Sequence, residues 1–563
     1  MIAGVSAGII LSGVCGCVTV DTRLGQDLMP LEQQYDVYTA EWKLNQVGMK
    51  PMDYMSGYSS RRITIGTVSD PLFGTIRKGS AFTLVPAADT LDFGTDPVVR
   101  EFHIALKKDT TNTIREDQLA ILQNVNVYSM EGLDVRIDSL SYIDELKRSM
   151  FDGAARISVG VPVYDGGDSL SFNFTRSFAD KMLQTFLDNL DEEKGVYIFD
   201  TSATFITEYI TKFPGIYLCT DDPVGYGGRF DMFDVAMGVS DSYATGNCAE
   251  LKFTSTYDGE KKDTSMLFLF GAVEAPNGTV LPDQYAFNAT EIENGIAETD
   301  AAAEVIYVEG GNGVKPVLSA KEIYGLITAE IDAKCPSGVT RDRVIINKAS
   351  VKMPFEFPAD YKYMEAFPQT LSPCCKVRGY ADGKKVYTYA NLTDASISAE
   401  SHGEIDRSNL NYTADFSFHA QKMLTLTEPH DTTLSNYDVW FLINYTEINE
   451  SSSSSSSDSY SDYLNQLYYY NYLNQLYGGY GGYGYGGYGY GSYGGYGGYG
   501  YNNYYSMMMY SSLYGSSSSS STAEESVELD RDRFYGAMLC GRESGNGPTL
   551  TLTYSVPKRD SSL

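Results

Sequence analysis

Short stretches in which apolar and polar residues alternate recur along most of the chain and predict β-strands. Residues 62–68 (Arg-Ile-Thr-Ile-Gly-Thr-Val) have this period of two, and residues 157–161 repeat it. Apolar residues at helical spacing are clearest over residues 178–190, where Thr175 or Ser177 is available as an N-cap. The pattern therefore predicts a mainly β protein with a few short helices.

The predicted elements occur twice in a similar order, which indicates two tandem β-sandwich units of jelly-roll-like plan. We place the first unit at residues 58–275 and the second at residues 319–450 together with 523–557. Between them, residues 276–318 are rich in Gly, Asn, Glu and Ala, so we expect a linker there.

A low-complexity insert, residues 451–522, interrupts the second unit. It contains two runs of Ser, two copies of Tyr-Leu-Asn-Gln-Leu-Tyr and repeated Gly-Gly-Tyr, and residues 463–523 carry no charge. Gly and Ser disfavour ordering, and Tyr without aliphatic partners cannot build a packed core, so we expect a disordered loop. Tyr also suits binding surfaces. Two interpretations of the insert therefore remain: its tyrosines contact a glycan, a partner barrel or another copy of the protein, or the insert is a neutral spacer.

The first seventeen residues predict a lipoprotein signal. Residues 1–16 are small or apolar, carry no charge and are too short to span a bilayer. Val14 lies three residues before Cys17 and Gly16 directly before it, which resembles a bacterial lipobox. Cys15 is a poorer acceptor, because Val14 then occupies the position where a small residue is needed. We therefore predict that residues 1–16 are a signal peptide and that Cys17 is acylated; a buried N-terminal strand is the alternative.

Acidic residues dominate the charge of the chain. Asp and Glu number 73 against 42 Lys and Arg, which gives a net charge of −31. This balance argues against nucleic-acid binding, which depends on basic residues that neutralise phosphates, and against electrostatic docking on anionic lipid. A covalent lipid anchor would then hold the protein at a membrane, with the polar residues 17–57 as a tether.

Matches to catalytic motifs occur only where their structural context is wrong. G-x-S-x-G at residues 4–8 lies in the signal region, and G-x-G-x-x-G at residues 482–487 lies in the Gly-Tyr repeat. None of the four histidines has zinc-ligand spacing: His103, His402, His419 and His430. We therefore predict no catalytic residue, no cofactor and no metal site.

Two acidic turns and one cysteine pair leave alternatives open. Asp221-Asp222 and Asp165-Gly166-Gly167-Asp168 offer the oxygen ligands that Ca²⁺ prefers, but plain turns are the simpler expectation in so acidic a chain. Cys219 and Cys248 are candidates for one disulfide in an oxidising compartment. The paired carboxylates of a glycosidase cannot be singled out among 73 acidic residues.

Four motifs, taken in order, resemble a known family. They lie at residues 24–30, 66–75 (Gly-Thr-Val-Ser-Asp-Pro-Leu-Phe-Gly-Thr), 213–218 and 548–554. Together they are similar to a Bacteroidota lipoprotein family known as domain-of-unknown-function family 4270, over nearly all of the chain after the signal except the insert. The resemblance implies an outer-membrane lipoprotein with no assigned enzymatic activity. It leaves the periplasmic face and the cell surface both open, because residues 18–22 hold only one carboxylate of the acidic signal that exported lipoproteins of that phylum usually carry.

We predict a non-enzymatic outer-membrane lipoprotein that serves as a structural or accessory subunit of an envelope assembly. The alternative is a glycan-binding surface lipoprotein that works with a nutrient-uptake barrel. The expected partners are the outer membrane, through the lipid anchor, and either an outer-membrane β-barrel protein or a glycan. A glycan binder should expose two or three coplanar aromatic rings on its folded part, whereas an accessory subunit needs a wide surface for protein contact.

Overall fold

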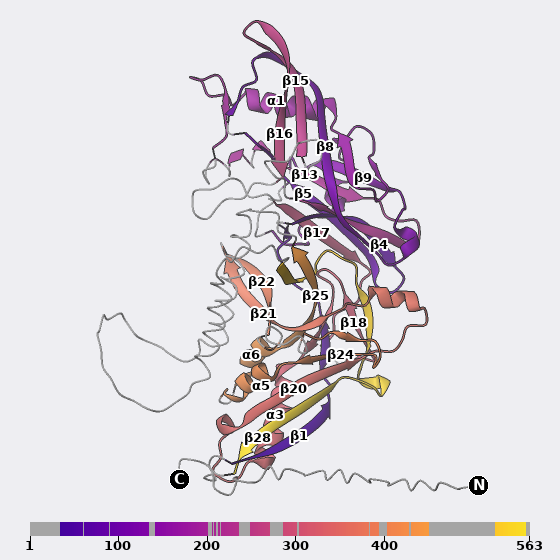
Figure 1. Cartoon of the computed structure of the whole chain (residues 1–563), viewed down its shortest axis with the longest axis vertical. Coiled ribbons are helices and arrows are strands. Elements are labelled where there is room, and N and C mark those ends of the chain that lie inside the picture. Colours follow the sequence, from indigo (N-terminus) through magenta and orange to yellow (C-terminus); the bar gives the residue numbers. More distant parts are fainter. Residues whose placement is uncertain are drawn as a thin grey trace, which may run out of the picture.

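The computed structural model describes residues 34–558 except 60, 89, 134–140, 201–204, 206, 207, 210, 211, 214, 236–247, 271–284, 301, 302, 382, 393, 395–401, 427, 428 and 450–523. Strands dominate the described residues and helices are few and short, which confirms the predicted mainly β fold class. The molecule is elongated (Figure 1). The hairpin of β15 (Cys248–Tyr257) and β16 (Glu260–Phe270) lies at one end, and β1 (Tyr35–Lys43) and β28 (Thr549–Pro557) lie at the other.

Strands from residues 58–293 join in one antiparallel sheet, which we call the upper unit after its place in Figure 1. Besides β15 and β16, its strands are β3 (Tyr58–Ser59), β4 (Arg62–Asp70), β5 (Gly74–Phe82), β6 (Leu84–Pro86), β8 (Thr95–Thr113), β9 (Gln123–Ser129), β10 (Val163–Tyr164), β11 (Ser169–Asn173), β13 (Ile216–Thr220), β14 (Gly227–Asp234) and β17 (Ala286–Glu293). A separate small pair joins β7 (Thr90–Leu91) to β12 (Tyr197–Ile198).

Strand β8 changes partners along its length, and this lets the sheet fold over on itself. Its first half pairs with β11 and β15, and its second half pairs with β14. Side chains from both parts, such as Ile104 of β8 and Phe233 of β14, therefore enter one hydrophobic core. Helix α1 (Arg176–Leu187) packs against the same core. The hydroxyl of Thr175 accepts a hydrogen bond from Phe178 N at 3.4 Å, which confirms one of the two predicted N-caps.

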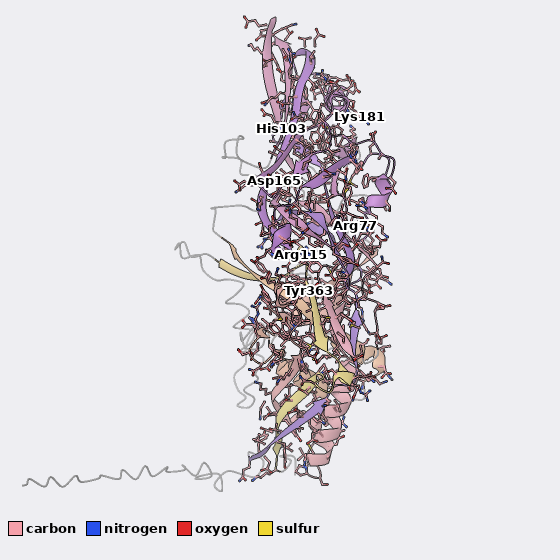
Figure 2. All side chains as sticks on the ribbon, turned by 90° about the vertical axis from the view of Figure 1, so that its right-hand side faces the viewer. Arg77, His103, Arg115, Asp165, Lys181 and Tyr363 are labelled. Carbon is pink, nitrogen blue, oxygen red and sulfur yellow. The ribbon has the colours of Figure 1, made fainter. Side chains whose placement is uncertain are left out.

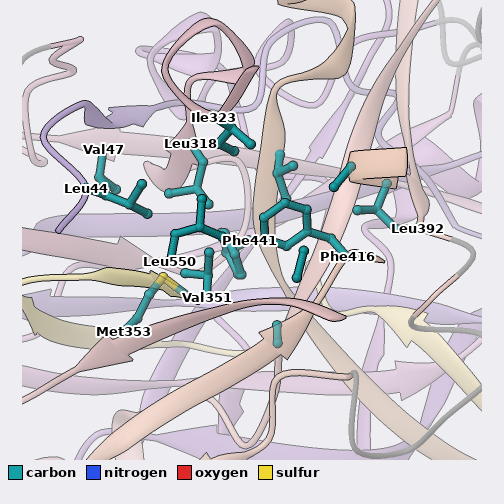
Figure 3. Close-up of a cluster of buried hydrophobic side chains, with 14 of the residues drawn as sticks. Leu44, Val47, Leu318, Ile323, Val351, Met353, Leu392, Phe416, Phe441 and Leu550 are labelled. Carbon is teal, nitrogen blue, oxygen red and sulfur yellow. The ribbon is translucent and has the colours of Figure 1, made fainter. Parts of the chain in front are cut away.

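The remaining strands form the lower unit, in which two antiparallel sheets face a common core and a separate pair joins β18 to β27. One sheet has the order β1-β28-β20-β24-β23, and the other has the order β2-β19-β25-β21-β22 with β26 paired to β25. Figure 3 shows part of the core, where Val351 of β20 and Leu550 of β28 meet Leu318 of β19 and Phe441 of β25. The bounds are β2 (Val47–Lys50), β18 (Val305–Glu309), β19 (Lys315–Leu318), α3 (Ala320–Lys334), β20 (Ile345–Pro354), β21 (Leu371–Ala381), β22 (Lys384–Asn391), β23 (Ile405–Asp406), β24 (Asn411–Asp415), α5 (Ser417–Leu424), α6 (Asp431–Leu434), β25 (Val439–Asn449), β26 (Glu524–Leu529) and β27 (Gly536–Cys540).

The predicted tether, residues 17–57, is wrong from residue 35 onward. Strand β1 pairs with β28 over its whole length, and β2 pairs with β19, so this segment belongs to the lower unit. Tyr38 and Trp42 of β1 pack against the lower core. Burial of these two rings favours pairing over a free tether.

The predicted linker, residues 276–318, also contains strands. β17 pairs with β5 of the upper unit, whereas β18 pairs with β27 and β19 pairs with β2 and β25 of the lower unit. The Gly-rich composition reflects the tight turn between β18 and β19, where a Cβ on Gly313 would come within 2.5 Å of Glu309 Cβ.

The strand predicted over residues 157–161 is not formed as such; the structure has only one β-bridge there, between Ser158 and Phe174.

Candidate functional site

The predicted lipidation residue, Cys17, and the insert at residues 451–522 lie outside the described residues, so both remain predictions. Gln34, the first described residue, lies beside Lys558, the last, because Lys558 N donates a hydrogen bond to Gln34 O at 2.9 Å. Both ends of the described chain therefore lie by β1 and β28, at the lower end of Figure 1. No helix within the described part of the chain is long and apolar enough to cross a bilayer.

The first acidic turn, Asp221-Asp222, receives its donors from neighbouring side chains. Arg77 Nε lies 2.8 Å and Arg148 Nη1 2.7 Å from Asp222 Oδ1. The hydrogen bonds from Arg77 are the main reason why the pKa of Asp222 falls to about 2, with those from Arg148 adding to the effect. Asp221 accepts hydrogen bonds from the amide groups of Asn124 and Asn126. This geometry favours the plain turn over a Ca²⁺ ligand set.

The second acidic turn is closed by its own backbone. Gly167 N donates to Asp165 Oδ1 at 2.9 Å, the arrangement of an Asx turn, and Asp168 O accepts from Lys108 N. Within the described residues, no three His, Cys, Asp or Glu side chains come together as a metal site. The structure therefore brings neither acidic turn together with further oxygen ligands.

The candidate disulfide is not formed. Cys219 is a free, buried thiol on β13, and burial raises the pKa of its thiol to about 12. Cys248 begins β15, which pairs with β8 rather than with β13. The two cysteines therefore lie on strands with different partners. Their positions in the sequence did not indicate which strands would pair.

Cys375, His419 and Asp394 come together in the lower unit but lack the geometry of a nucleophile and its base. Cys375 Sγ lies 3.9 Å from one ring nitrogen of His419 and 4.0 Å from the other, so it is nearly equidistant from both and forms no short hydrogen bond with either. His419 Nε2 is hydrogen-bonded to Tyr437 O at 2.8 Å, and Asp394 accepts from backbone N–H groups rather than from the imidazole. Burial lowers the pKa of His419 to about 4, which keeps the ring neutral inside the core.

A buried arginine of the upper unit has many hydrogen bonds, and sequence analysis did not single it out. Arg229 Nε donates to both carboxylate oxygens of Asp231, and both side chains are 0% exposed. The Nη atoms of Arg229 donate to the carbonyls of Leu119, Ile121 and Tyr164. The pair thus ties β14 to the loop before β9. Residues two apart in a strand point to the same face, so the spacing of Arg229 and Asp231 in the sequence could have predicted that these two side chains lie together.

Residues 530–535, which follow β26, connect the two units. Lys78 Nζ of β5 donates to Arg531 O at 2.6 Å, and Thr64 Oγ1 of β4 donates to Asp532 Oδ1 at 2.9 Å. Phe534 packs with upper-unit side chains in a shared hydrophobic cluster. Full burial lowers the pKa of Lys78 to about 8, because removal from water penalises its charged form. Residues 530–535 therefore hold the two units together through both hydrogen bonds and apolar contacts.

Loops from both units that carry exposed apolar side chains meet near this segment. Gln118 Oε1 accepts from Gly228 N at 3.3 Å, which joins the loop before β9 to the start of β14. Ile114 of the upper unit and Ala366 of the short helix Tyr361–Ala366 belong to the same hydrophobic cluster as Phe534. Figure 2 shows Arg115 and Tyr363 close together, in agreement with their electrostatic interaction. We define the junction surface as the exposed side chains of Leu72, Leu119, Val224, Tyr226, Tyr361 and Tyr363.

A second aromatic group, on the other side of the junction, contains rings that are not coplanar. Tyr54 lies 4.8 Å from Tyr387 and 5.5 Å from Tyr142 between ring centroids, at interplanar angles of 75° and 74°. These residues cover the edge of β22, since Tyr387 N donates to Tyr54 O and the Tyr142 hydroxyl donates to Lys385 O. The three tyrosines therefore connect the two units and cover a sheet edge. Their arrangement differs from the coplanar platform expected of a glycan binder.

Comparison of the chain with models of protein families, with curated proteins and with solved structures found no match in any of the three.

Proposed function

We propose that this protein is a non-enzymatic lipoprotein of the outer membrane that contacts a protein partner of the cell envelope through the junction surface. The observation that carries this proposal is that loops of both units, each with exposed apolar and aromatic side chains, meet at the junction. Tyr226 is 63% exposed and Tyr361 is 66% exposed. Grouped aromatic side chains of this kind are typical of protein interfaces, where a few of them supply most of the affinity.

The position of the chain ends is consistent with an anchored subunit. The residues that follow the predicted lipidation site lead into β1, at the lower end of the molecule. A lipid anchor on Cys17 would then attach the lower unit near the membrane and leave the junction surface and the upper unit farther out. The rings at Tyr54, Tyr142 and Tyr387 seal a sheet edge, so this group does not supply the coplanar platform that the glycan-binding alternative requires.

Affinity isolation of the full-length protein from cross-linked membranes in mild detergent tests this proposal. The Tyr226→Glu/Tyr361→Glu variant should lose its co-purifying envelope protein, because burying two carboxylates at an interface opposes binding. Tyr380→Glu is the matched control, since Tyr380 is 73% exposed on β21 and lies outside the junction surface. Cys17→Ala should release the protein from membranes, whereas Cys15→Ala should not.

Two results would contradict the proposal. Recovery of the wild-type protein alone would contradict the existence of a partner. Equal loss of the partner in the Tyr380→Glu control would show that the junction surface is not its binding site. Membrane retention of Cys17→Ala together with release of Cys15→Ala would identify Cys15 as the acylated residue.

A further inference from the structure

An open groove lies beside helix α1 in the upper unit, away from the junction. The space between its walls is about 480 Å³ when the open solvent at its mouth is included, so the groove is shallow and widely open. Apolar side chains of Leu84, Phe178, Met182, Phe213 and Ile216 line its floor. Stacking of Phe213 on Phe186, at 4.8 Å between ring centroids, holds one wall in place. The groove is therefore a hydrophobic slot built on a packed core.

Two lysines stand at the mouth of this groove. Lys181 of α1 forms an ion pair with Glu131, and both side chains are 58% exposed. Lys212 Nζ donates to Asn189 Oδ1 at 2.7 Å, so a neutral amide is its hydrogen-bond acceptor. The mouth thus has two ammonium groups and one carboxylate, in a chain whose net charge is −31. Figure 2 shows Lys181 well above Arg115 and Tyr363, so this site is separate from the junction surface.

We infer that the α1 groove binds an amphiphilic carboxylate, with the apolar body of the ligand on the aromatic floor and its carboxylate at Lys212. The floor offers apolar contacts, which favour an alkyl or aryl chain. An exposed ion pair such as that of Lys181 and Glu131 contributes little to stability, so Lys181 can turn from Glu131 towards the carboxylate held at Lys212 at small cost. Charge complementarity therefore selects an anionic head group over a neutral or cationic one.

Titration calorimetry of the full-length chain, produced in the cytoplasm where it is not acylated, tests this inference. Decanoate is the probe, below its micelle concentration, with decan-1-ol and decyltrimethylammonium as neutral and cationic ligands of equal chain length. Decanoate should bind about tenfold more tightly than decan-1-ol, because it adds a charge-assisted hydrogen bond. The cation should bind more weakly than either.

Three variants locate the site. Lys212→Met should weaken decanoate binding about tenfold and leave decan-1-ol binding unchanged. Lys194→Met is the matched control, an exposed lysine in the loop after α1 that does not line the groove. Thr185→Trp, from the helix side of the groove, should abolish binding of both ligands with an unchanged circular dichroism spectrum.

The inference is overturned if the three ligands bind equally, or if no ligand binds. It is also overturned if Lys194→Met weakens decanoate binding as much as Lys212→Met, since the effect would then be one of overall charge. Undiminished binding to a folded Thr185→Trp variant would place the ligand elsewhere on the protein.

Discussion

Replacing Arg229 with Met should destabilise the upper unit by about 3–5 kcal/mol at pH 7, the cost of leaving one member of a buried ion pair without its partner. Arg229 and Asp231 are both 0% exposed. The guanidinium donates to both Asp231 oxygens and to the carbonyls of Leu119, Ile121 and Tyr164. Met fills a similar volume but donates no hydrogen bond. One carboxylate and three carbonyls would therefore each lose a donor.

The loss of stability in Arg229→Met should shrink as the pH falls. Burial already raises the pKa of Asp231, and removal of the guanidinium would raise it further. A carboxyl group whose pKa is higher in the folded state than in the unfolded state destabilises the fold above its folded pKa. This penalty disappears as the pH falls through the folded pKa towards the unfolded value of about 3.9. The deficit at pH 7 should therefore exceed that at about pH 5.

Hydrogen exchange of the β8 and β14 amides is the suitable assay. Both tryptophans, Trp42 and Trp440, pack in the lower unit, so tryptophan fluorescence would not report on the upper unit. Arg115→Met is the control, because Arg115 and Asp117 form an exposed, solvent-screened pair whose loss should leave stability nearly unchanged. Equal protection factors in the two variants, or a deficit that does not change with pH, would refute the reasoning.

Two further predictions concern the insert and the lower core. Replacing residues 450–523 with a Gly-Ser linker of about ten residues should leave the melting temperature nearly unchanged, because Asn449 and Glu524 are direct partners in the β25–β26 pair and this shortening changes the closure free energy of the loop by under about 2 kcal/mol. A much lower melting temperature in calorimetry would mean that the insert packs against the sandwich. His419→Gln should reduce acid sensitivity, because burial lowers the pKa of His419 to about 4 and the wild type loses about 3 kcal/mol as the pH falls from about 6.5 through that value. The measurement is the fall in the urea unfolding midpoint between pH 7 and each acidic pH. An equal fall in the variant and in the wild type would contradict this prediction.

Local chemistry explains the features that could be predicted from the sequence. Alternation with a period of two indicated β-strands, and the Thr175 hydroxyl caps α1 as its position before an apolar helical stretch suggested. The turn after β4 is also local, since Asp70 Oδ1 accepts from the N–H groups of Leu72 and Phe73. In each case the interacting groups lie within a few residues of one another, so a short window of sequence contains all of them.

By itself, the sequence determined a mainly β chain with a capped helix and an acidic surface; the pairing of distant strands was decided only in the tertiary structure. Tyr38 of β1 stacks on Tyr554 of β28, although these strands stand at opposite ends of the described chain. Alternation shows which side chains of a strand face a core, but many partner strands satisfy that requirement equally. The choice among them depends on the apolar area that the whole fold buries. For the same reason, the exposure of Tyr226 and Tyr361 at the junction could not be predicted, because it depends on which loops of the two units come together.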